Sequence, residues 1–295
     1  MAKPHPPKGT LIAVGGNEDK GIEQSEQYSL DFIEDGILSR IVKEAGGKDA
    51  NISVVTTASS IPQQVAKNYL TAFGKLGCKN VNILDIRNKF DVKKADNINL
   101  IKKSDVVMLS GGDQRRLVHI IGGSEIHKIL KQRYQEDDFI IAGTSAGAMA
   151  MSKEMISGGS STTAMLKGNV SMMQGFGFLE EVIVDSHFIN RGRFGRLTEA
   201  VAKFPKLLGI GLGEDTGVII KEGNICTTIG SGMVLVFDGE HLSHNKVPDL
   251  DEGTPISIGN MIVHVMANTD TFYLGPRHLK ILTADQAYEQ EADWQ

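Results

Sequence analysis

The sequence contains few cysteines and no long hydrophobic run. Cys78 and Cys226 are the only cysteines, too few for a disulfide framework or a cysteine metal site. No apolar run approaches the roughly 18 residues that a membrane-spanning helix needs, so we expect a soluble protein. The patterns H-E-x-x-H, C-x-x-C and G-x-x-x-x-G-K-[ST] are also missing, and we therefore expect no metal and no cofactor.

An excess of positive charge is missing as well. Lysine and arginine number 31 against 36 aspartates and glutamates, which gives a formal net charge of −5. This balance argues against nucleic acid or an anionic membrane as a partner. Residues 1–9 lack the apolar stretch of a signal peptide, and we expect them to be a short disordered lead. A cytoplasmic protein fits these features best.

Hydrophobic residues make up 41% of the chain, which is enough for a large core. In the first half, short apolar runs that end in small residues alternate with amphipathic segments. This alternation predicts a doubly wound α/β fold, in which helices flank a mainly parallel sheet. We expect strands at residues 11–14, 52–57, 106–109 and 139–142, and helices near residues 27–45, 62–76 and 114–133.

The pattern changes after about residue 205. Apolar runs at 217–220, 225–229 and 233–237 are separated by only a few glycine-rich residues. This spacing leaves no room for helices and predicts antiparallel hairpins. Without a long linker to divide the chain, residues 10–295 are expected to form one domain, with residues 217–295 as an antiparallel extension.

A candidate nucleophile lies in the sequence G-T-S-A-G at residues 143–147, between a predicted buried strand and a predicted helix. A G-x-S-x-G turn of this kind exposes the serine oxygen in a strained conformation, and it needs small neighbours. Ser145 is therefore the predicted nucleophile. The alternative is a strand-end turn with an incidental serine.

A serine nucleophile needs a base and an acid that orients the base. Among eight histidines, His187 stands out because it follows the apolar run 182–184 at a strand end, where the sites of open sheets collect. It could also be a neutral histidine paired with Asp185. For the acid, Glu214 and Asp215 lie together between glycines after another apolar run.

A second order of residues is also open. In the order Ser…Asp/Glu…His, the acid precedes the histidine along the chain. Asp185 or Glu214 would then orient His241, His244 or His264.

Two further groups of residues suit such a site. Gly112, in the pair Gly111-Gly112 after a predicted strand, and Ala146, next after Ser145, can offer backbone N–H groups to an oxyanion. Three arginines follow the His187 segment, and guanidinium groups suit a bidentate clamp on a carboxylate. A solvated helix face is the alternative for this cluster, which comprises Arg191, Arg193 and Arg196.

Taken together, these motifs resemble those of the cyanophycinases, within the serine peptidase family that also contains peptidase E. They follow one another in the family's order and span roughly residues 10 to 220. The matching segments are GGNEDK at 15–20, GGDQ at 111–114, GTSAGA at 143–148, DSHFINRGRFGR at 185–196 and GEDT at 213–216.

The resemblance implies Ser145 as nucleophile, His187 as base and Glu214 as acid. It also implies a class I glutamine amidotransferase-like architecture, a homodimer, and exopeptidase cleavage of cyanophycin, a poly-aspartate chain that carries arginine on each β-carboxyl group. The product is the β-Asp-Arg dipeptide. The residues that it implies in the substrate pocket are Gln114, Asp185, Ser186, Arg191, Arg193 and Arg196.

Two positions depart from the family's pattern. Ser186 stands where cyanophycinases usually have glutamine, so at least one hydrogen bond in the pocket must change. Asn17 stands where alanine is more usual. Two other functions therefore stay open: an isoaspartyl or aspartyl dipeptidase for other β-aspartyl substrates, and a catalytically silent protein that binds aspartyl peptides.

Overall fold

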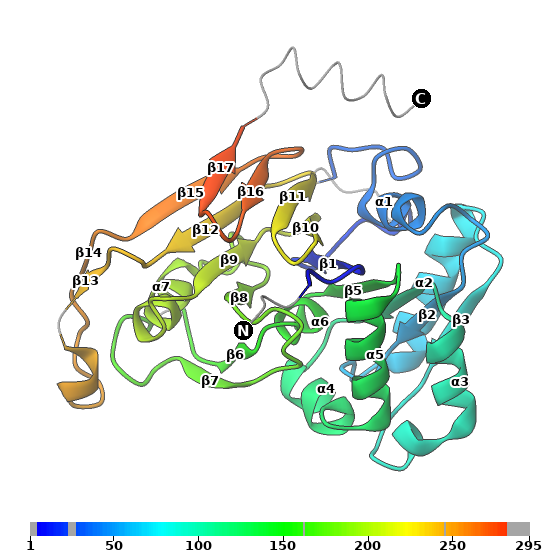
Figure 1. The fold of residues 1–295 in the computed structure, drawn as a ribbon, viewed down its shortest axis with the longest axis horizontal. Coiled ribbons are helices and arrows are strands. Elements are labelled where there is room, and N and C mark those ends of the chain that lie inside the picture. The colour runs from blue at the N-terminus through cyan, green and yellow to red at the C-terminus, as the bar shows by residue number, and fades with distance from the viewer. Residues whose placement is uncertain (1–4, 23–27, 162, 245, 282–295) are drawn as a thin grey trace.

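A computed structural model gives the fold (Figure 1) and describes residues 5–22, 28–161, 163–244 and 246–281. Of the predicted disordered lead, residues 1–4 lie outside this part of the chain. The amides of Lys8 and Gly9 donate hydrogen bonds to the carbonyl oxygens of Gln135 and Tyr134, at 3.3 and 2.9 Å. The predicted disorder therefore does not extend to Lys8 and Gly9.

Five strands from the first half of the chain form the parallel part of a nine-stranded sheet. Their order is β3, β2, β4, β5, β1, and every neighbouring pair is parallel. The strands are β1 (Thr10–Val14), β2 (Ile52–Val55), β3 (Val81–Leu84), β4 (Val106–Leu109) and β5 (Ile140–Thr144). Four of them were predicted. The apolar pattern misses β3 because this edge strand is only partly buried and contains Asn82.

Helices cover both faces of this parallel part, as predicted (Figure 1). Alternate residues of β1 point to opposite faces, because side chains alternate along a strand. Ile12 and Val14 belong to the core on the side of the first two helices, whereas Leu11 and Ala13 belong to the core on the other side. The helices are α1 (Ile37–Glu44), α2 (Pro62–Lys75), α3 (Ala95–Lys103), α4 (Gln114–Ile121) and α5 (Glu125–Glu136).

Two helices differ from their predicted extents. The segment predicted at 27–45 becomes helical only at Ile37, because the Asp31 carboxylate accepts the amides of Ile33 and Glu34 and holds a turn there. Residue 27 lies outside the described residues. The segment predicted at 114–133 is two helices, α4 and α5. Glycines 122 and 123 separate them, and the Ser124 hydroxyl caps the second helix.

Four antiparallel strands complete the nine-stranded sheet on the other side of β1. The first of them, β10, pairs antiparallel with β1, so that β1 lies between β5 and β10. This half of the sheet comprises β10 (Thr216–Lys221), β11 (Ile225–Gly230), β16 (Thr271–Tyr273) and β17 (His278–Lys280).

A second sheet of four strands lies beside the first, in the order β15, β12, β9, β8. Its members are β8 (Val182–Asp185), β9 (Leu208–Leu212), β12 (Val234–Asp238) and β15 (Ile262–Met266), and α7 (Phe194–Lys203) connects the parallel pair β8 and β9. The predicted hairpin of 217–220 with 225–229 is present as β10 and β11. A hairpin of 225–229 with 233–237 is not formed. The chain turns at Gly230, which has a φ of 98°, and β12 pairs with β9 and β15 in the second sheet.

The remaining elements are short, and α6 is the one that bears on the site. They are α6 (Ala146–Met149), β6 (Glu154–Gly158), β7 (Ser171–Gln174), β13 (Ser243–His244), β14 (Ile258–Gly259) and the 3₁₀ turns Asp91–Lys93 and Val247–Asp249. Within the described residues, every helix is too short or too polar to span a bilayer. The glutamine amidotransferase-like architecture and the single-domain boundaries stay predictions.

Candidate active site

Ser145 lies in the sharp turn between β5 and α6. Its backbone has φ 51° and ψ −108°, a conformation that costs a residue with a side chain about 1–3 kcal/mol. The turn fits because the residues two positions before and two positions after Ser145 are glycines. A Cβ on Gly143 would lie 2.6 Å from the Gly147 carbonyl carbon, and one on Gly147 would lie 2.2 Å from the Leu109 carbonyl oxygen. The glycines of G-x-S-x-G are therefore required by packing.

His187 follows β8 and reaches Ser145 from the second sheet. Its ring Nε2 lies 2.9 Å from the Ser145 Oγ, and its Nδ1 lies 2.6 Å from a carboxylate oxygen of Glu214. Its backbone also has a positive φ, 47°, and its amide donates to the Gly15 carbonyl oxygen at 2.8 Å. A Cβ on Gly16 would lie 2.4 Å from the ring, so the ring position requires glycine there.

The structure separates the two candidate acids. Glu214 contacts His187, whereas the Asp215 carboxylate accepts hydrogen bonds from the Asp19 amide at 2.9 Å and the Ser231 hydroxyl at 2.6 Å. Asp215 therefore fixes the neighbouring loops. The Asn17 side chain also helps to lower the pKa of Glu214 through a hydrogen-bonding interaction. The unusual residue Asn17 is exposed and interacts with the acid.

The order Ser…Asp/Glu…His is not formed. His244 lies in β13 and His264 in β15, where its ring lies 5.2 Å from that of Phe272. Within the described residues, the imidazole that meets Ser145 is that of His187. The alternative pairing of His187 with Asp185 is not formed either, since Asp185 pairs with arginines.

Burial and charge set the protonation of the imidazole. Burial lowers the pKa of His187, the positive charges of Arg191 and Arg193 lower it further, and the Glu214 carboxylate opposes them. Burial alone would raise the pKa of Glu214, but its hydrogen bonds from Asn17 and His187 outweigh this and lower it. At neutral pH the imidazole is therefore neutral and Glu214 ionised, so Nε2 can accept a proton.

The two glycines after β4 lie beside Ser145. A Cβ on Gly111 would be 3.5 Å from the Ser145 Cβ. Gly112 has a φ of 141°, and the Asp113 amide donates to the Ala58 carbonyl oxygen at 3.0 Å, which fixes the turn. Within the described residues, the amides of Gly112 and Ala146 have no hydrogen-bond acceptor. They are therefore free to donate to a bound group.

Asp185 holds two of the three arginines from inside. Its carboxylate is fully buried, accepts the Arg196 Nε at 2.9 Å and also contacts the Arg196 Nη2. Arg193 Nη1 lies 3.2 Å from the same carboxylate and donates to the Ser186 carbonyl oxygen at 2.6 Å. The two parallel donors of the Arg196 guanidinium are thus already bonded to Asp185. Arg196 therefore lies neither on a solvated helix face nor in an open clamp for a substrate carboxylate. Arg191 is exposed.

Two other predicted pocket residues also have protein partners. The Ser186 side chain is buried, and its hydroxyl donates to the Met149 sulfur at 3.3 Å. The Gln114 amide nitrogen donates to the Ile156 carbonyl oxygen at 3.0 Å. A ligand would therefore compete with these contacts or use the carbonyl end of Gln114.

The sequence interpretation missed a buried carboxylate behind the site. Glu18 accepts hydrogen bonds of 2.6 Å from both the Tyr69 hydroxyl and the Thr144 hydroxyl, and it pairs with Lys20 at 3.0 Å. Burial would raise the pKa of Glu18, but Lys20 and the two hydroxyls outweigh it, so the carboxylate is ionised. Because Thr144 precedes Ser145, Glu18 supports the nucleophile's turn. The segment GGNEDK at 15–20 was the available signal, but it entered only as part of the family resemblance, which gave Glu18 no role.

Comparisons with known proteins give the family of this chain. The family model described as peptidase family S51 matches residues 28–228. Cyanophycinase of Trichormus variabilis is 34% identical over 277 residues, covering 94% of this chain and 89% of the relative. Cyanophycinase of Geminocystis herdmanii is 32% identical over 265 residues, covering 90% of this chain and 93% of the relative.

A solved structure shares the fold. The crystal structure of a peptidase from an acI-B1 actinobacterium aligns with a TM-score of 0.63 at 18% identity, covering 92% of this chain and 98% of the other. The sequence matches make this chain a serine-type peptidase. It belongs to peptidase family S51.

Proposed function

We propose that this peptidase is a cyanophycinase that works through Ser145, His187 and Glu214. The observation that carries the proposal is the unbroken line of contacts, 2.9 Å from the Ser145 Oγ to Nε2 and 2.6 Å from Nδ1 to Glu214. The similarity to curated cyanophycinases over 90% or more of the chain supports the substrate.

In the first half of the reaction, the Ser145 oxygen attacks the scissile carbonyl carbon while His187 Nε2 takes the hydroxyl proton. Glu214 accepts the Nδ1–H hydrogen bond and stabilises the imidazolium that forms. The amides of Gly112 and Ala146 donate to the oxyanion. His187 then gives the proton to the leaving amine, and an acyl-enzyme remains on Ser145.

In the second half, water attacks the acyl-enzyme and gives its proton to Nε2. The carbon–Oγ bond breaks, Ser145 recovers its proton, and the acid product leaves. For cyanophycin, we propose stepwise release of β-Asp-Arg dipeptides. Arg191 and Arg193 are the arginines with the most capacity left for a substrate carboxylate, and Arg196 supports them by fixing Asp185. The homodimer and the cytoplasmic location stay predictions.

The test is incubation of the purified protein with cyanophycin and with a panel of α- and β-aspartyl dipeptides, followed by identification of the products by mass. We expect β-Asp-Arg from cyanophycin and no product with Ser145→Ala. Cleavage of dipeptides alone would overturn the proposal and favour an isoaspartyl or aspartyl dipeptidase.

One observation favours that second candidate. The Ser186 hydroxyl points to the Met149 sulfur and is buried, so it offers a ligand nothing in place of the usual glutamine amide. A silent binding protein is a poorer fit, because the base contacts the serine and the acid contacts the base. Labelling of Ser145 by a fluorophosphonate probe separates the enzymes from a silent binder, which should not react.

A further inference from the structure

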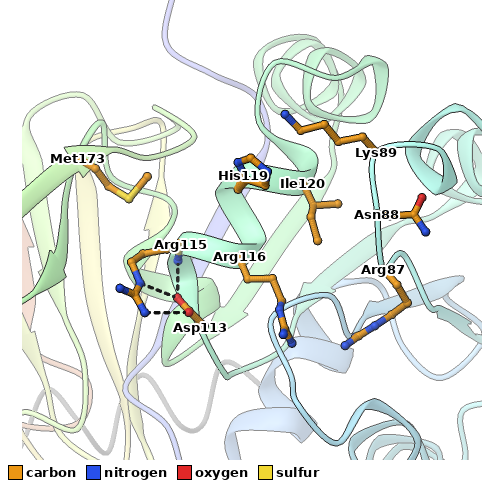
Figure 2. A pocket seen from close by; sticks show the side chains of 9 residues that line it. All are labelled: Arg87, Asn88, Lys89, Asp113, Arg115, Arg116, His119, Ile120 and Met173. Carbon is orange, nitrogen blue, oxygen red and sulfur yellow. Dashed lines mark hydrogen bonds and ion pairs between the residues drawn. The ribbon is translucent and has the colours of Figure 1, made fainter.

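A basic groove lies beyond the Gly111-Gly112 turn, where the chain enters α4. It has a volume of about 780 Å³, and its lining includes Arg87, Lys89, Asp113, Arg115 and Arg116. Figure 2 shows the side chains of Arg87 and Arg116 extending toward the same part of the groove. The groove is thus lined by four cationic side chains and one carboxylate, although the chain as a whole has a net charge of −5.

Two of these cations are held at a single oxygen atom. Arg87 Nη2 donates to the Ser59 carbonyl oxygen at 2.8 Å, and Arg116 Nη1 donates to the same oxygen at 3.2 Å. Arg87 Nη1 also donates to the Thr56 carbonyl oxygen at 2.9 Å, which fixes its guanidinium. Two like charges held this close repel each other, and an anion between them would remove the repulsion.

The pairing of these arginines is unequal. Arg115 is neutralised by Asp113, which contacts its Nε at 3.2 Å and its Nη2 at 3.1 Å. Arg87 Nε lies 3.5 Å from a carboxylate oxygen of Asp85, which is largely exposed. Within the described residues, Arg116 has no carboxylate partner. It also lies in the first turn of α4, where the helix dipole disfavours a positive charge.

The arginine pair is connected directly to the catalytic turn. Ala58 precedes Ser59, and its carbonyl oxygen accepts the Asp113 amide at 3.0 Å. Asp113 is two residues from Gly111, which spans at most about 7 Å of extended chain. A Cβ built on Gly111 would in turn lie 3.5 Å from the Ser145 Cβ, so the two residues are close neighbours. The groove residue Asp113 thus directly follows the Gly111-Gly112 turn beside Ser145, which places the groove next to the catalytic turn.

We propose that Arg87 and Arg116 bind a carboxylate of the peptide substrate outside the repeat that is being cleaved. The proposal rests on the proposed function, because each repeat of cyanophycin carries a free arginine α-carboxylate. Among the described residues, Arg116 uses only Nη1 on a protein acceptor, so its Nε and Nη2 can meet a carboxylate with two parallel hydrogen bonds, while Arg87, whose guanidinium is fixed by protein acceptors, adds its charge. The groove then favours substrates of several repeats over a single dipeptide.

The test measures binding by calorimetry to a Ser145→Ala protein, which holds substrate without turnover. The probe is a fragment of cyanophycin with three repeats, with its arginine α-carboxylates free or amidated. Adding Arg116→Gln should weaken binding of the free fragment about tenfold, the scale of one charge-assisted hydrogen bond, and leave the amidated fragment unchanged. Lys48→Gln is the control. Lys48 is exposed and lies before the start of β2, at the end of this strand opposite to the groove. It should leave both affinities unchanged.

Several results would overturn the proposal. They are equal affinity with and without Arg116, equal losses for both fragments, a loss with Lys48→Gln as large as that with Arg116→Gln, or no binding of the free fragment. Binding of inorganic phosphate that depends on Arg116 and excludes the fragment would assign the pair to a free anion. Turnover of cyanophycin by the unmodified protein is measured in parallel. If turnover is absent while the fragment still binds through Arg116, the proposed function fails and the anion site stands.

Discussion

The two sheets contribute different parts of the active site. The nine-stranded sheet supplies Ser145, from a turn that packs tightly against β4 and β1. The four-stranded sheet supplies His187 at the end of β8, and Glu214 lies in the link from β9 of the second sheet to β10 of the first. Neither sheet holds a complete site. Catalytic geometry is thus a property of the junction between them.

The backbone at this junction carries the cost of the arrangement. Asn17, Ser145, His187 and Asp215 all have positive φ angles between 45° and 51°. Such conformations are unfavourable for residues with side chains, and they persist where the surrounding structure fixes them. Four of them around one site indicate that both sheets are held in register there by many contacts at once.

The largest effect should come from removing either half of the contact between the sheets. Ser145→Ala and His187→Ala should each lower kcat by about 10⁴- to 10⁶-fold, because the two groups act as one unit. The double variant should be no worse than either single variant. Steady-state kinetics with unfolding temperatures as a folding control will measure this. Multiplying losses in the double variant would show that the two residues act independently.

The link between the sheets should matter next. Glu214→Gln should lower kcat by about 10²- to 10⁴-fold, since the imidazolium loses its counter-charge. Asp215→Asn should cost less, because Asp215 bonds to Asp19 and Ser231 rather than to His187. Both variants are compared at neutral pH. The reverse ranking would make Asp215 the acid.

A stability effect should sharpen the role of the second sheet. Asp185→Asn leaves Arg193 and Arg196 without their buried counter-charge and should destabilise the protein by about 3–5 kcal/mol. Arg196→Lys, which keeps the charge and loses the fork, should cost less. Urea unfolding monitored by circular dichroism gives both values. An Asp185→Asn protein of normal stability but raised KM would make Asp185 a substrate ligand instead.

The smallest effect should be a shift in pH dependence. The charge of Arg191 holds the pKa of His187 down, so Arg191→Gln should raise that pKa. Catalysis needs the neutral imidazole and is lost as pH falls through this pKa. The acid limb of kcat/KM should therefore move to higher pH in the variant, whereas Lys48→Gln should leave it in place. An unchanged limb in Arg191→Gln would mean that His187 does not set it.

The parallel half of the fold could be predicted because its information is local. Buried parallel strands are short apolar runs closed by small residues, and the runs that end at Val14, Leu109 and Ala142 met this description. Their carboxyl ends meet at one edge of the sheet, so the motifs after them had to lie together. That placement puts the Gly111-Gly112 turn beside Ser145, whereas His187 follows β8 of the second sheet.

What could not be predicted depends on partners far away in the sequence. Glu18 is recognisable as a buried support only beside Tyr69 and Thr144, which are 51 and 126 positions away. Helical spacing places Arg193 and Arg196 near each other but does not indicate that Asp185 occupies them from β8. The partner of β12 was missed for the same reason, since the nearest apolar run is not the one that pairs with it.

The position of β1 between β5 and β10 has a consequence for the order of folding. On one side, the Thr10 amide donates to the carbonyl oxygen of Phe139, next to β5, at 2.9 Å. On the other side, the Gly15 amide donates to the carbonyl oxygen of Thr216 in β10, at 2.8 Å. Contacts between distant segments form late, and an unpaired strand edge can associate with other chains. Pulsed hydrogen exchange during refolding should find the two amides protected at different times, with Thr10 first. Simultaneous protection would mean that both halves of the sheet close on β1 in one step. Until β10 arrives, β1 has an unpaired edge that can associate with other chains.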